Sequence, residues 1–231
     1  AMQRGTFVPY QHQKGEVPKT FNQFVRADRG GLVFQPTAGV FQNVAILDFS
    51  SKMASIMIEY NVSPETVVHI EEPGEGYEIP ELGVKILSPR GLIPQTLQFM
   101  RDKRLALKRL LKSIDKKDPR YRASYRRYKA VADALKWLTV VCYGRLGFAN
   151  STFGRINAHE VVSYLSRKAI TRSKSIAASM GFDVLHVYVD SLFVSRPGAS
   201  REDFQNLANE IGKETHLPMD LENVYSWFAF L

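Results

Sequence analysis

The alternation of hydrophobic and polar positions predicts strands joined to helices at both ends of the chain. The predicted strands are NVAILDF, LHVYVDSLFV and ENVYSWFAFL, and the second of these is a hairpin with Asp190 and Ser191 at its tip. Apolar residues at helical spacing predict helices in SSKMASIMIEYN, INAHEVVSYLSRKAITRSKSIAASMG and ASREDFQNLANEIGKETH. We expect Gly181 to close the second helix and Ser200 to cap the third. This order of elements predicts an α+β fold, an antiparallel sheet backed by helices.

The middle of the chain predicts an inserted pair of long helices. The first has a stripe of apolar residues every three or four positions, at Leu97, Met100, Leu107, Leu111 and Ile114. The second has a matching stripe, at Tyr121, Tyr125, Tyr128, Ala132, Leu135, Thr139 and Cys142. Asp118 is the expected N-cap of the second helix, and Pro119 stands at its first position. Two such helices joined by a short turn form an antiparallel hairpin.

This helical hairpin carries the excess positive charge of the chain. The 231 residues have a formal net charge of +8, whereas residues 101–129 contain thirteen Lys or Arg and three Asp, a net charge of +10. Such a concentration of positive charge indicates a polyanionic partner, either nucleic acid or a triphosphate. A solvated, lysine-rich helical surface is the alternative interpretation.

Arg104 interrupts the apolar stripe of the first long helix. Arg104, Lys108 and Lys112 recur every four residues, so they project from one side of that helix. Arg104 is therefore either an arginine that snorkels from a packed seam or a cation held in place for phosphate.

Composition narrows the class of protein. The single cysteine, Cys142, excludes an internal disulfide and fits a reducing, intracellular setting. The chain has no run of eighteen apolar residues and no apolar segment of a secretory signal near its first residue, so we expect a cytoplasmic protein with no membrane partner. Its five histidines do not fall at zinc-binding spacings.

Two aspartates stand at the ends of predicted strands. Asp48 ends NVAILDF, and Asp190 lies at the tip of the hairpin. If the two strands are neighbours, the carboxylates meet at one edge of the sheet, and at about 4 Å they repel by roughly 4 kcal/mol at an effective dielectric constant near 20. A proton or a cation relieves that repulsion, and Mg²⁺ prefers carboxylates together with substrate phosphates. Taken separately, Asp48 is also a reasonable helix N-cap and Asp190 a reasonable turn residue.

Three motifs resemble those of the family B DNA-dependent DNA polymerases, most closely the archaeal members. The segment ADRGGLVFQPTAGVFQNVAILDFSSKMASIMIEYNVSPETV resembles the first motif, with its DFxSLYPSI core and YNxSPET tail. LKWLTVVCYGRLGF is similar to the second, KxxxNSxYGxxG, and LHVYVDSLFV to the third, YxDTDSLFV. GVKILSPRGLIPQTLQFMRDKRLALKRLLK resembles the stretch that opens the family's fingers helices. The resemblance runs from about Ala27 to the end of the chain, with the motifs in the family's order.

The resemblance implies a domain plan and an activity. Residues 1–92 and 148–231 would form the palm, and residues 93–147 would form the inserted fingers. The implied activity is template-directed DNA synthesis from a dNTP on a DNA primer–template, with two Mg²⁺ ions that Mn²⁺ can replace. It also implies a nucleoid-associated protein of DNA replication or repair.

The resemblance also assigns roles to single residues. Asp48 and Asp190 match the catalytic aspartates that hold the metals, and the carbonyl of Phe49 matches a further metal ligand. The implied nucleotide-binding residues are Phe49, Ser50, Ser51, Lys52, Met53, Arg104, Lys108, Lys136, Tyr143 and Gly144. The first five open the helix after Asp48, where backbone amides can host a triphosphate. The three cations would grip that triphosphate. The Tyr-Gly pair would lie beside the nascent base pair, where glycine allows a base to approach the backbone closely.

The motifs depart from the family pattern at several positions. Tyr188 replaces the first aspartate of DTD, so we expect catalysis to be weakened rather than lost. The Asn-Ser pair of the second motif reads Val140-Val141, which removes a polar contact near the triphosphate. Leu-Tyr-Pro of the first motif reads Lys52-Met53-Ala54. The family's tyrosine excludes a 2′-hydroxyl, and methionine bends easily, so we expect weaker rejection of ribonucleotides.

Two parts of the family's plan are not recognised in the sequence. No acidic exonuclease motif precedes Ala27, and the sequence stops at WFAFL, where a thumb would begin. We therefore expect no proofreading, weak and strongly salt-dependent DNA binding, and a truncated or split polymerase with a thumb-bearing partner chain or a clamp as a further partner.

Two other functions remain as alternatives. The first is a catalytically degenerate DNA-binding or scaffold module that has kept the polymerase fold. The second is a reverse-transcriptase-like enzyme, because YVDS resembles YxDD; the long basic hairpin between Asp48 and Asp190 disfavours it.

Overall fold

The chain folds into two compact units. The structure is a computed structural model that describes residues 20–22, 25, 29–115, 117, 121–148 and 151–231. One unit, here called the sheet unit, comprises Asp28–Lys52 and Ser163–Leu231; the other, here called the helical unit, comprises Ala1–Ala27 and Met53–Val162. The helices α2 (Lys52–Glu59) and α5 (Ile156–Ser179) each contain a boundary between the two units.

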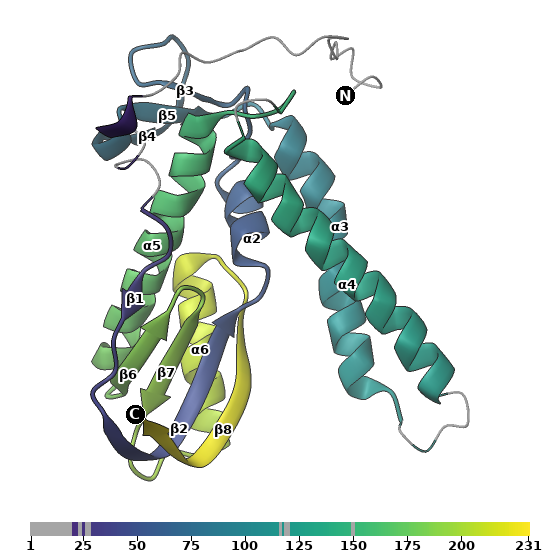
Figure 1. Cartoon of the computed structure of the whole chain (residues 1–231), viewed down its shortest axis with the longest axis vertical. Helices are drawn as coiled ribbons and strands as arrows, with labels where there is room; N and C mark the ends of the chain where they lie inside the picture. The colour runs from purple at the N-terminus through teal and green to yellow at the C-terminus, as the bar shows by residue number, and fades with distance from the viewer. Residues whose placement is uncertain (1–19, 23–24, 26–28, 116, 118–120, 149–150) are drawn as a thin grey trace. The chain divides into compact units, whose positions relative to one another are not determined.

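A five-stranded antiparallel sheet forms the centre of the sheet unit (Figure 1). Its strands, in spatial order, are β1 (Val33–Phe34), β6 (Asp183–Tyr188), β7 (Ser191–Ser195), β2 (Gly39–Phe49) and β8 (Met219–Phe230). The helix α6 (Arg201–Thr215) packs against β8, and Figure 1 shows α6 behind the sheet. Phe204, Leu207 and Ile211 of α6 are fully buried, as are Leu47 and Val194 of the central strands. Burial of this apolar face holds the edge that carries Asp48 in a fixed register.

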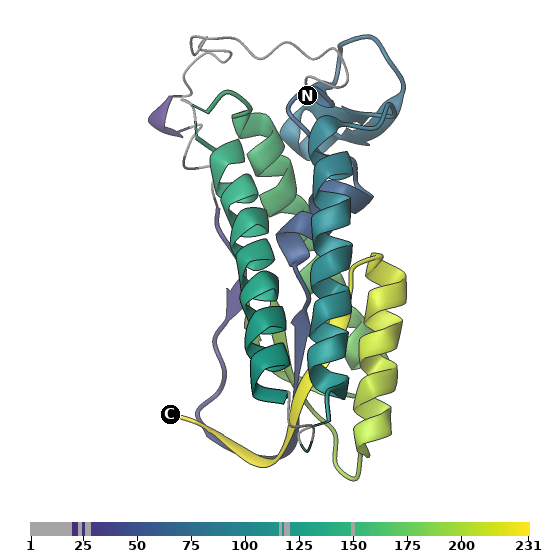
Figure 2. The same ribbon diagram turned by 90° about the vertical axis from the view of Figure 1, so that its right-hand side faces the viewer.

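Two long helices dominate the helical unit. α3 (Leu92–Ser113) and α4 (Tyr121–Leu146) contact one another, and Figure 2 shows them side by side. Their contact follows the predicted stripes, since Leu97, Ala132 and Thr139 are buried. The predicted capping residues Asp118 and Pro119 lie outside the described residues.

A second, smaller sheet belongs to the helical unit. It has the strand order β3-β5-β4, with β3 (Val67–His69), β4 (Gly76–Ile79) and β5 (Val84–Leu87), and the 3₁₀ helix η2 (Pro80–Leu82) connects the last two. All its pairings are antiparallel. The sequence patterns did not predict this sheet.

The α+β prediction is confirmed, and each predicted element exists with altered bounds. β2 begins earlier than NVAILDF, and β8 begins three residues before ENVYSWFAFL. α5 is followed by Gly181 with φ 77°, and Ser200 is the N-cap of α6, both as expected. Within the part of the chain that the structure describes, no helix combines the length and the hydropathy needed to cross a bilayer. The assignment of residues 1–92 and 148–231 to a palm and of 93–147 to fingers stays a prediction.

Candidate active site

Asp48 and Asp190 come together because β2 and β7 are neighbouring strands. Asp48 is the register partner of Ser191, the residue that follows Asp190. The Ser191 hydroxyl donates a hydrogen bond of 2.6 Å to Asp48 Oδ1. The N–H of Phe49 donates to the backbone carbonyl of Asp190 at 3.0 Å. The condition that the two strands are neighbours is therefore met, and backbone and side-chain hydrogen bonds tie their ends together.

A third carboxylate, which the sequence patterns missed, lies opposite Asp48 on the other neighbouring strand. Asp220 of β8 is the register partner of Asp48 and accepts a hydrogen bond from the Ser50 hydroxyl. It was missed because the strand was expected to begin at Glu222. Among the described residues, no three acidic, histidine or cysteine side chains form a group able to hold a metal ion, so Asp220 is not assigned as a ligand.

The turn that presents Asp190 is strained. Val189 has φ 50°, a left-handed conformation that is unfavourable for a β-branched residue. Its N–H donates to the carbonyl of Leu32 at 3.0 Å. A Cβ placed on Gly31 would lie 2.7 Å from the Val189 methyl groups, so a residue without a side chain is needed there. Contacts from the segment before β1 thus fix the turn and, with it, the position of Asp190.

Lys52 lies beside Asp190 rather than in solvent. Its side chain is 1% exposed, its ammonium donates to the Val189 carbonyl at 2.7 Å, and the same nitrogen is 3.4 Å from Asp190 Oδ1. Burial lowers the pKa of Lys52 below its ordinary value, while the nearby carboxylates of Asp190 and Asp48 offset part of that effect. The sequence marked Lys52 as a departure from the motif but did not predict this ion pair.

The carboxylates fit a divalent cation. Asp190 Oδ1 is buried and accepts no hydrogen bond from any residue that the structure describes, although the side chain as a whole is 40% exposed. The Lys52 ammonium at 3.4 Å offsets part of the charge on this oxygen, and the exposed part of the Asp190 carboxylate remains accessible to a metal ion. Hard oxygen donors of this kind suit Mg²⁺, which also recruits substrate phosphates.

The segment after Asp48 offers fewer free amides than expected. The N–H of Phe49 is bonded to Asp190, and the N–H of Ser50 donates to the carbonyl of Pro218 at 2.9 Å. Both amides serve to hold the strand ends together, so neither is open to a triphosphate. The roles of Ser51, Lys52 and Met53 in phosphate binding stay predictions.

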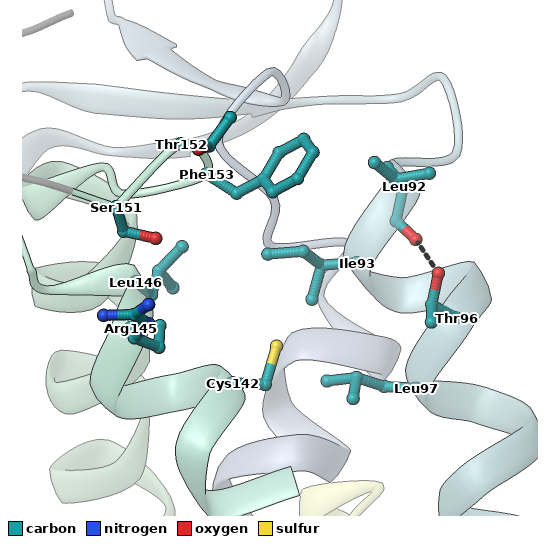
Figure 3. A pocket seen from close by; sticks show the side chains of 10 residues that line it. All are labelled: Leu92, Ile93, Thr96, Leu97, Cys142, Arg145, Leu146, Ser151, Thr152 and Phe153. Atoms are coloured by element: carbon teal, nitrogen blue, oxygen red, sulfur yellow. Dashed lines mark hydrogen bonds between the residues drawn. The ribbon is translucent and has the colours of Figure 1, made fainter. Parts of the chain in front are cut away.

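The predicted phosphate-binding cations lie on α3 and α4 of the helical unit. Arg104 and Lys108 are half-buried and one turn apart on α3, whereas Lys136 is exposed on α4. Ile93, Leu97, Cys142 and Leu146 line one cavity of about 440 Å³ between these helices (Figure 3).

The cavity itself contains none of the predicted site residues. Phe153, Thr152 and Ser151 close one side of it, and Cys142 and Arg145 lie on α4 on either side of the Tyr143–Gly144 pair (Figure 3). Burial raises the pKa of the Cys142 thiol, which keeps it protonated and unreactive.

Tyr143 and Gly144 differ in their surroundings. The Tyr143 ring stacks on His159 with centroids 4.4 Å apart and an interplanar angle of 17°, and the Tyr143 oxygen lies 3.3 Å from His159 Nε2. A Cβ on Gly144 would meet nothing within 4 Å. His159 was missed because it is remote in the sequence from the second motif. The open space at Gly144 is what the close approach of a base would require.

Comparison with known proteins extends the resemblance to almost the whole chain. The family model described as DNA polymerase family B matches residues 1–226, so the match includes residues before Ala27, where the motifs gave no signal. "DNA polymerase 2" of Saccharolobus solfataricus is 32% identical over 230 residues, covering 100% of this chain and 32% of that protein. "DNA polymerase" of Archaeoglobus fulgidus is 32% identical over 218 residues, covering 94% of this chain and 27% of that protein. The chain thus spans about a third of the length of these relatives.

A solved structure shows the same fold. The family B DNA polymerase from the hyperthermophilic archaeon Pyrobaculum calidifontis aligns with a TM-score of 0.68 and 27% identity, covering 87% of this chain and 26% of that one. Together with the family match over residues 1–226, this similarity identifies the chain as a member of DNA polymerase family B.

Proposed function

We propose that this chain catalyses template-directed DNA synthesis as the palm and fingers of a family B DNA polymerase. The observation that carries the proposal is the register of β2 and β7, which brings Asp48 and Ser191, the neighbour of Asp190, face to face at one edge of the sheet. In the reaction, the primer 3′-oxygen bonds to the α-phosphorus of a dNTP and loses its proton. The bond between that phosphorus and the bridging oxygen breaks, and pyrophosphate leaves.

In this proposal, Asp48, Asp190 and the carbonyl of Phe49 hold two divalent cations, Mg²⁺ or in its place Mn²⁺. When bound, such ions activate the primer hydroxyl and stabilise the leaving pyrophosphate. The protein orients the ligands: the Ser191 hydroxyl fixes Asp48 Oδ1, and the Phe49 N–H fixes the backbone at Asp190. These hydrogen bonds organise the carboxylates in advance, so that little rearrangement is needed at the moment of reaction.

The proposal also assigns nucleotide-binding residues within the helical unit. Arg104, Lys108 and Lys136 bind the triphosphate in this proposal, and Gly144 leaves room for the base. The basic hairpin would also attract the phosphate backbone of the primer–template. A role in replication or repair at the nucleoid, with a thumb-bearing chain or a clamp as partner, forms part of the same proposal.

One observation favours a second function, a catalytically degenerate DNA-binding or scaffold module. The ammonium of Lys52 already lies 3.4 Å from Asp190 Oδ1, so the carboxylate has a partner without a metal ion. Tyr188 in place of an aspartate removes a further acidic group from the same turn. A site stabilised in this way could keep the fold after losing catalysis.

Single-turnover primer extension separates the two functions. The parent chain is compared with Asp48→Asn and Asp190→Asn in Mg²⁺ at low salt and high protein concentration. Asp183→Asn is the matched control, because Asp183 is exposed at the far end of β6. We expect extension by the parent and the control and a loss of at least 10²-fold in both site variants. No extension by the parent, under conditions where it binds DNA and dNTP, would support the degenerate module instead.

A further inference from the structure

Lys52 is a buried cation placed directly at the proposed metal carboxylates. The motif that this segment resembles has leucine at that position. Packing at this place in the fold therefore does not require a charged side chain. Lys52 cannot be a lysine that snorkels to water, because its side chain is only 1% exposed. A buried ammonium persists where it is paired and hydrogen-bonded, so its partners indicate what it does.

The partners of Lys52 are the two residues of the hairpin tip. The ammonium donates to the carbonyl of Val189 at 2.7 Å and lies 3.4 Å from Asp190 Oδ1. Val189 is the strained residue with φ 50°, and Asp190 Oδ1 is the buried oxygen that accepts no hydrogen bond among the described residues. One cation therefore stabilises both unfavourable features of the turn.

We propose that Lys52 is a positioning residue that serves as a built-in counter-ion of Asp190, holding the turn ready and weakening the binding of divalent cations there. The inference rests on the proposed role of Asp190 as a metal ligand but not on polymerisation itself.

The physical reason is competition for the same negative charge. A divalent cation bound to Asp190 would experience repulsion from an ammonium 3.4 Å from the carboxylate oxygen. Because Lys52 itself is enclosed by protein, solvent screens its charge less than it would screen an exposed lysine. Removing the charge leaves the two carboxylates without a fixed counter-ion, so their affinity for a metal ion should rise by roughly tenfold or more.

The test measures metal binding by the protein alone. Mn²⁺ is titrated into the full chain without DNA or nucleotide, and electron paramagnetic resonance follows the loss of the free-ion signal. The variants are Lys52→Met, which keeps length without charge, Lys52→Leu, which restores the motif residue, and Lys52→Arg, which keeps the charge. Lys85→Met is the matched control, because Lys85 of β5 is a buried lysine of the helical unit, only 7% exposed.

We expect Lys52→Met and Lys52→Leu to bind Mn²⁺ at least tenfold more tightly than the parent, with Lys52→Arg and Lys85→Met within about twofold of it. Adding Asp190→Asn to Lys52→Met should abolish the gain, which assigns the gain to this site. The same variants should show a larger rise in melting temperature with Mn²⁺ than the parent does.

Equal or weaker Mn²⁺ binding by a folded Lys52→Met and Lys52→Leu would overturn the proposal, as would the absence of binding in all variants. The result is independent of catalysis. Tighter Mn²⁺ binding by the Lys52 variants, without primer extension by the parent, would support the counter-ion role and overturn the polymerase function. Primer extension by the parent, without a change in the Mn²⁺ affinity of the variants, would support the polymerase function and overturn the counter-ion role.

Discussion

At the scale of single residues, a substitution at Gly144 tests nucleotide binding separately from folding. It lies near the C-terminal end of α4, and a Cβ there would meet no atom within 4 Å. Gly144→Ala should therefore leave the fold intact and stabilise the helix by up to about 1 kcal/mol. If a base approaches the backbone at this point, the added methyl group should raise the KM for dNTP by roughly tenfold. Steady-state incorporation kinetics and thermal melting measure the two effects.

Gly147 provides the contrasting control three residues later. A Cβ there would lie 2.8 Å from the His159 ring, which is itself stacked on Tyr143 and has little freedom to move. Gly147→Ala should lower stability by about 1–3 kcal/mol. An unchanged KM in Gly144→Ala, with Gly147→Ala destabilised as expected, would argue against a nucleotide at Gly144.

The sequence allowed some of the residue contacts to be predicted and not others. Asp48 and Asp190 each follow an apolar strand run, so their meeting depended only on the two strands being neighbours. The contact of Lys52 with the hairpin tip depended on the direction in which its side chain leaves the start of α2 and on the strained turn at Val189. Neither is encoded in hydrophobic periodicity, because both result from tertiary packing.

At the scale of elements, the N-terminus of α6 is defined by a capping motif formed by Ser200 and Asp203. Ser200 Oγ accepts a hydrogen bond from the Asp203 N–H at 3.2 Å, and Asp203 Oδ2 accepts one from the Ser200 N–H at 2.7 Å, which is a capping box. Ser200→Ala removes half of it and should cost about 1 kcal/mol, or roughly 2–4 °C in melting temperature. Ser175→Ala, at an exposed position within α5, should change stability little.

The effect of Ser200→Ala should also depend on pH. Hydrogen bonds from the backbone and side chain of Ser200 hold the pKa of Asp203 below its ordinary value, with a further contribution from Arg196. A carboxyl with a lowered pKa contributes stability above the pKa of the unfolded state, and that contribution is lost as pH falls through the folded-state pKa. The stability difference between parent and Ser200→Ala should therefore shrink in acid; a difference that grows in acid would contradict the assigned hydrogen bonds.

The predicted elements were those with long, regular patterns. Strands β2, β6, β7 and β8 of the large sheet and the four helices α3 to α6 could be predicted because each repeats its apolar period several times, whereas the two-residue strand β1 could not. The sheet of β3, β5 and β4 could not, because its strands have only three or four residues and are separated by turns rich in Gly, Pro and Glu. Too few positions are present in such a strand to establish an alternation.

At the scale of the whole molecule, the informative quantity is where the charge lies. Residues 101–129 carry a net charge of +10, and the rest of the chain carries −2. Both that distribution and the pairing of the two long helices that carry it could be predicted from the sequence. In the structure, the basic residues of α4 such as Arg122 and Arg126 are exposed one turn apart. These side chains are therefore accessible to a polyanion and are not buried in the core.

DNA binding should consequently weaken steeply with salt, in proportion to the number of phosphates that the hairpin neutralises. Removing one phosphate-binding cation should reduce the slope of log K against log[salt] by about 0.9 for a duplex. Arg122→Gln combined with Arg126→Gln should thus reduce the slope by up to about 1.8. Lys213→Gln, an equally exposed change on α6 of the sheet unit, should leave it unaltered. Fluorescence anisotropy of a labelled primer–template over a salt series measures the slope. If Lys213→Gln reduced the slope by as much per charge as the two arginine substitutions on α4, the proposal for the basic hairpin would be wrong. The net charge of the chain alone would then account for DNA binding.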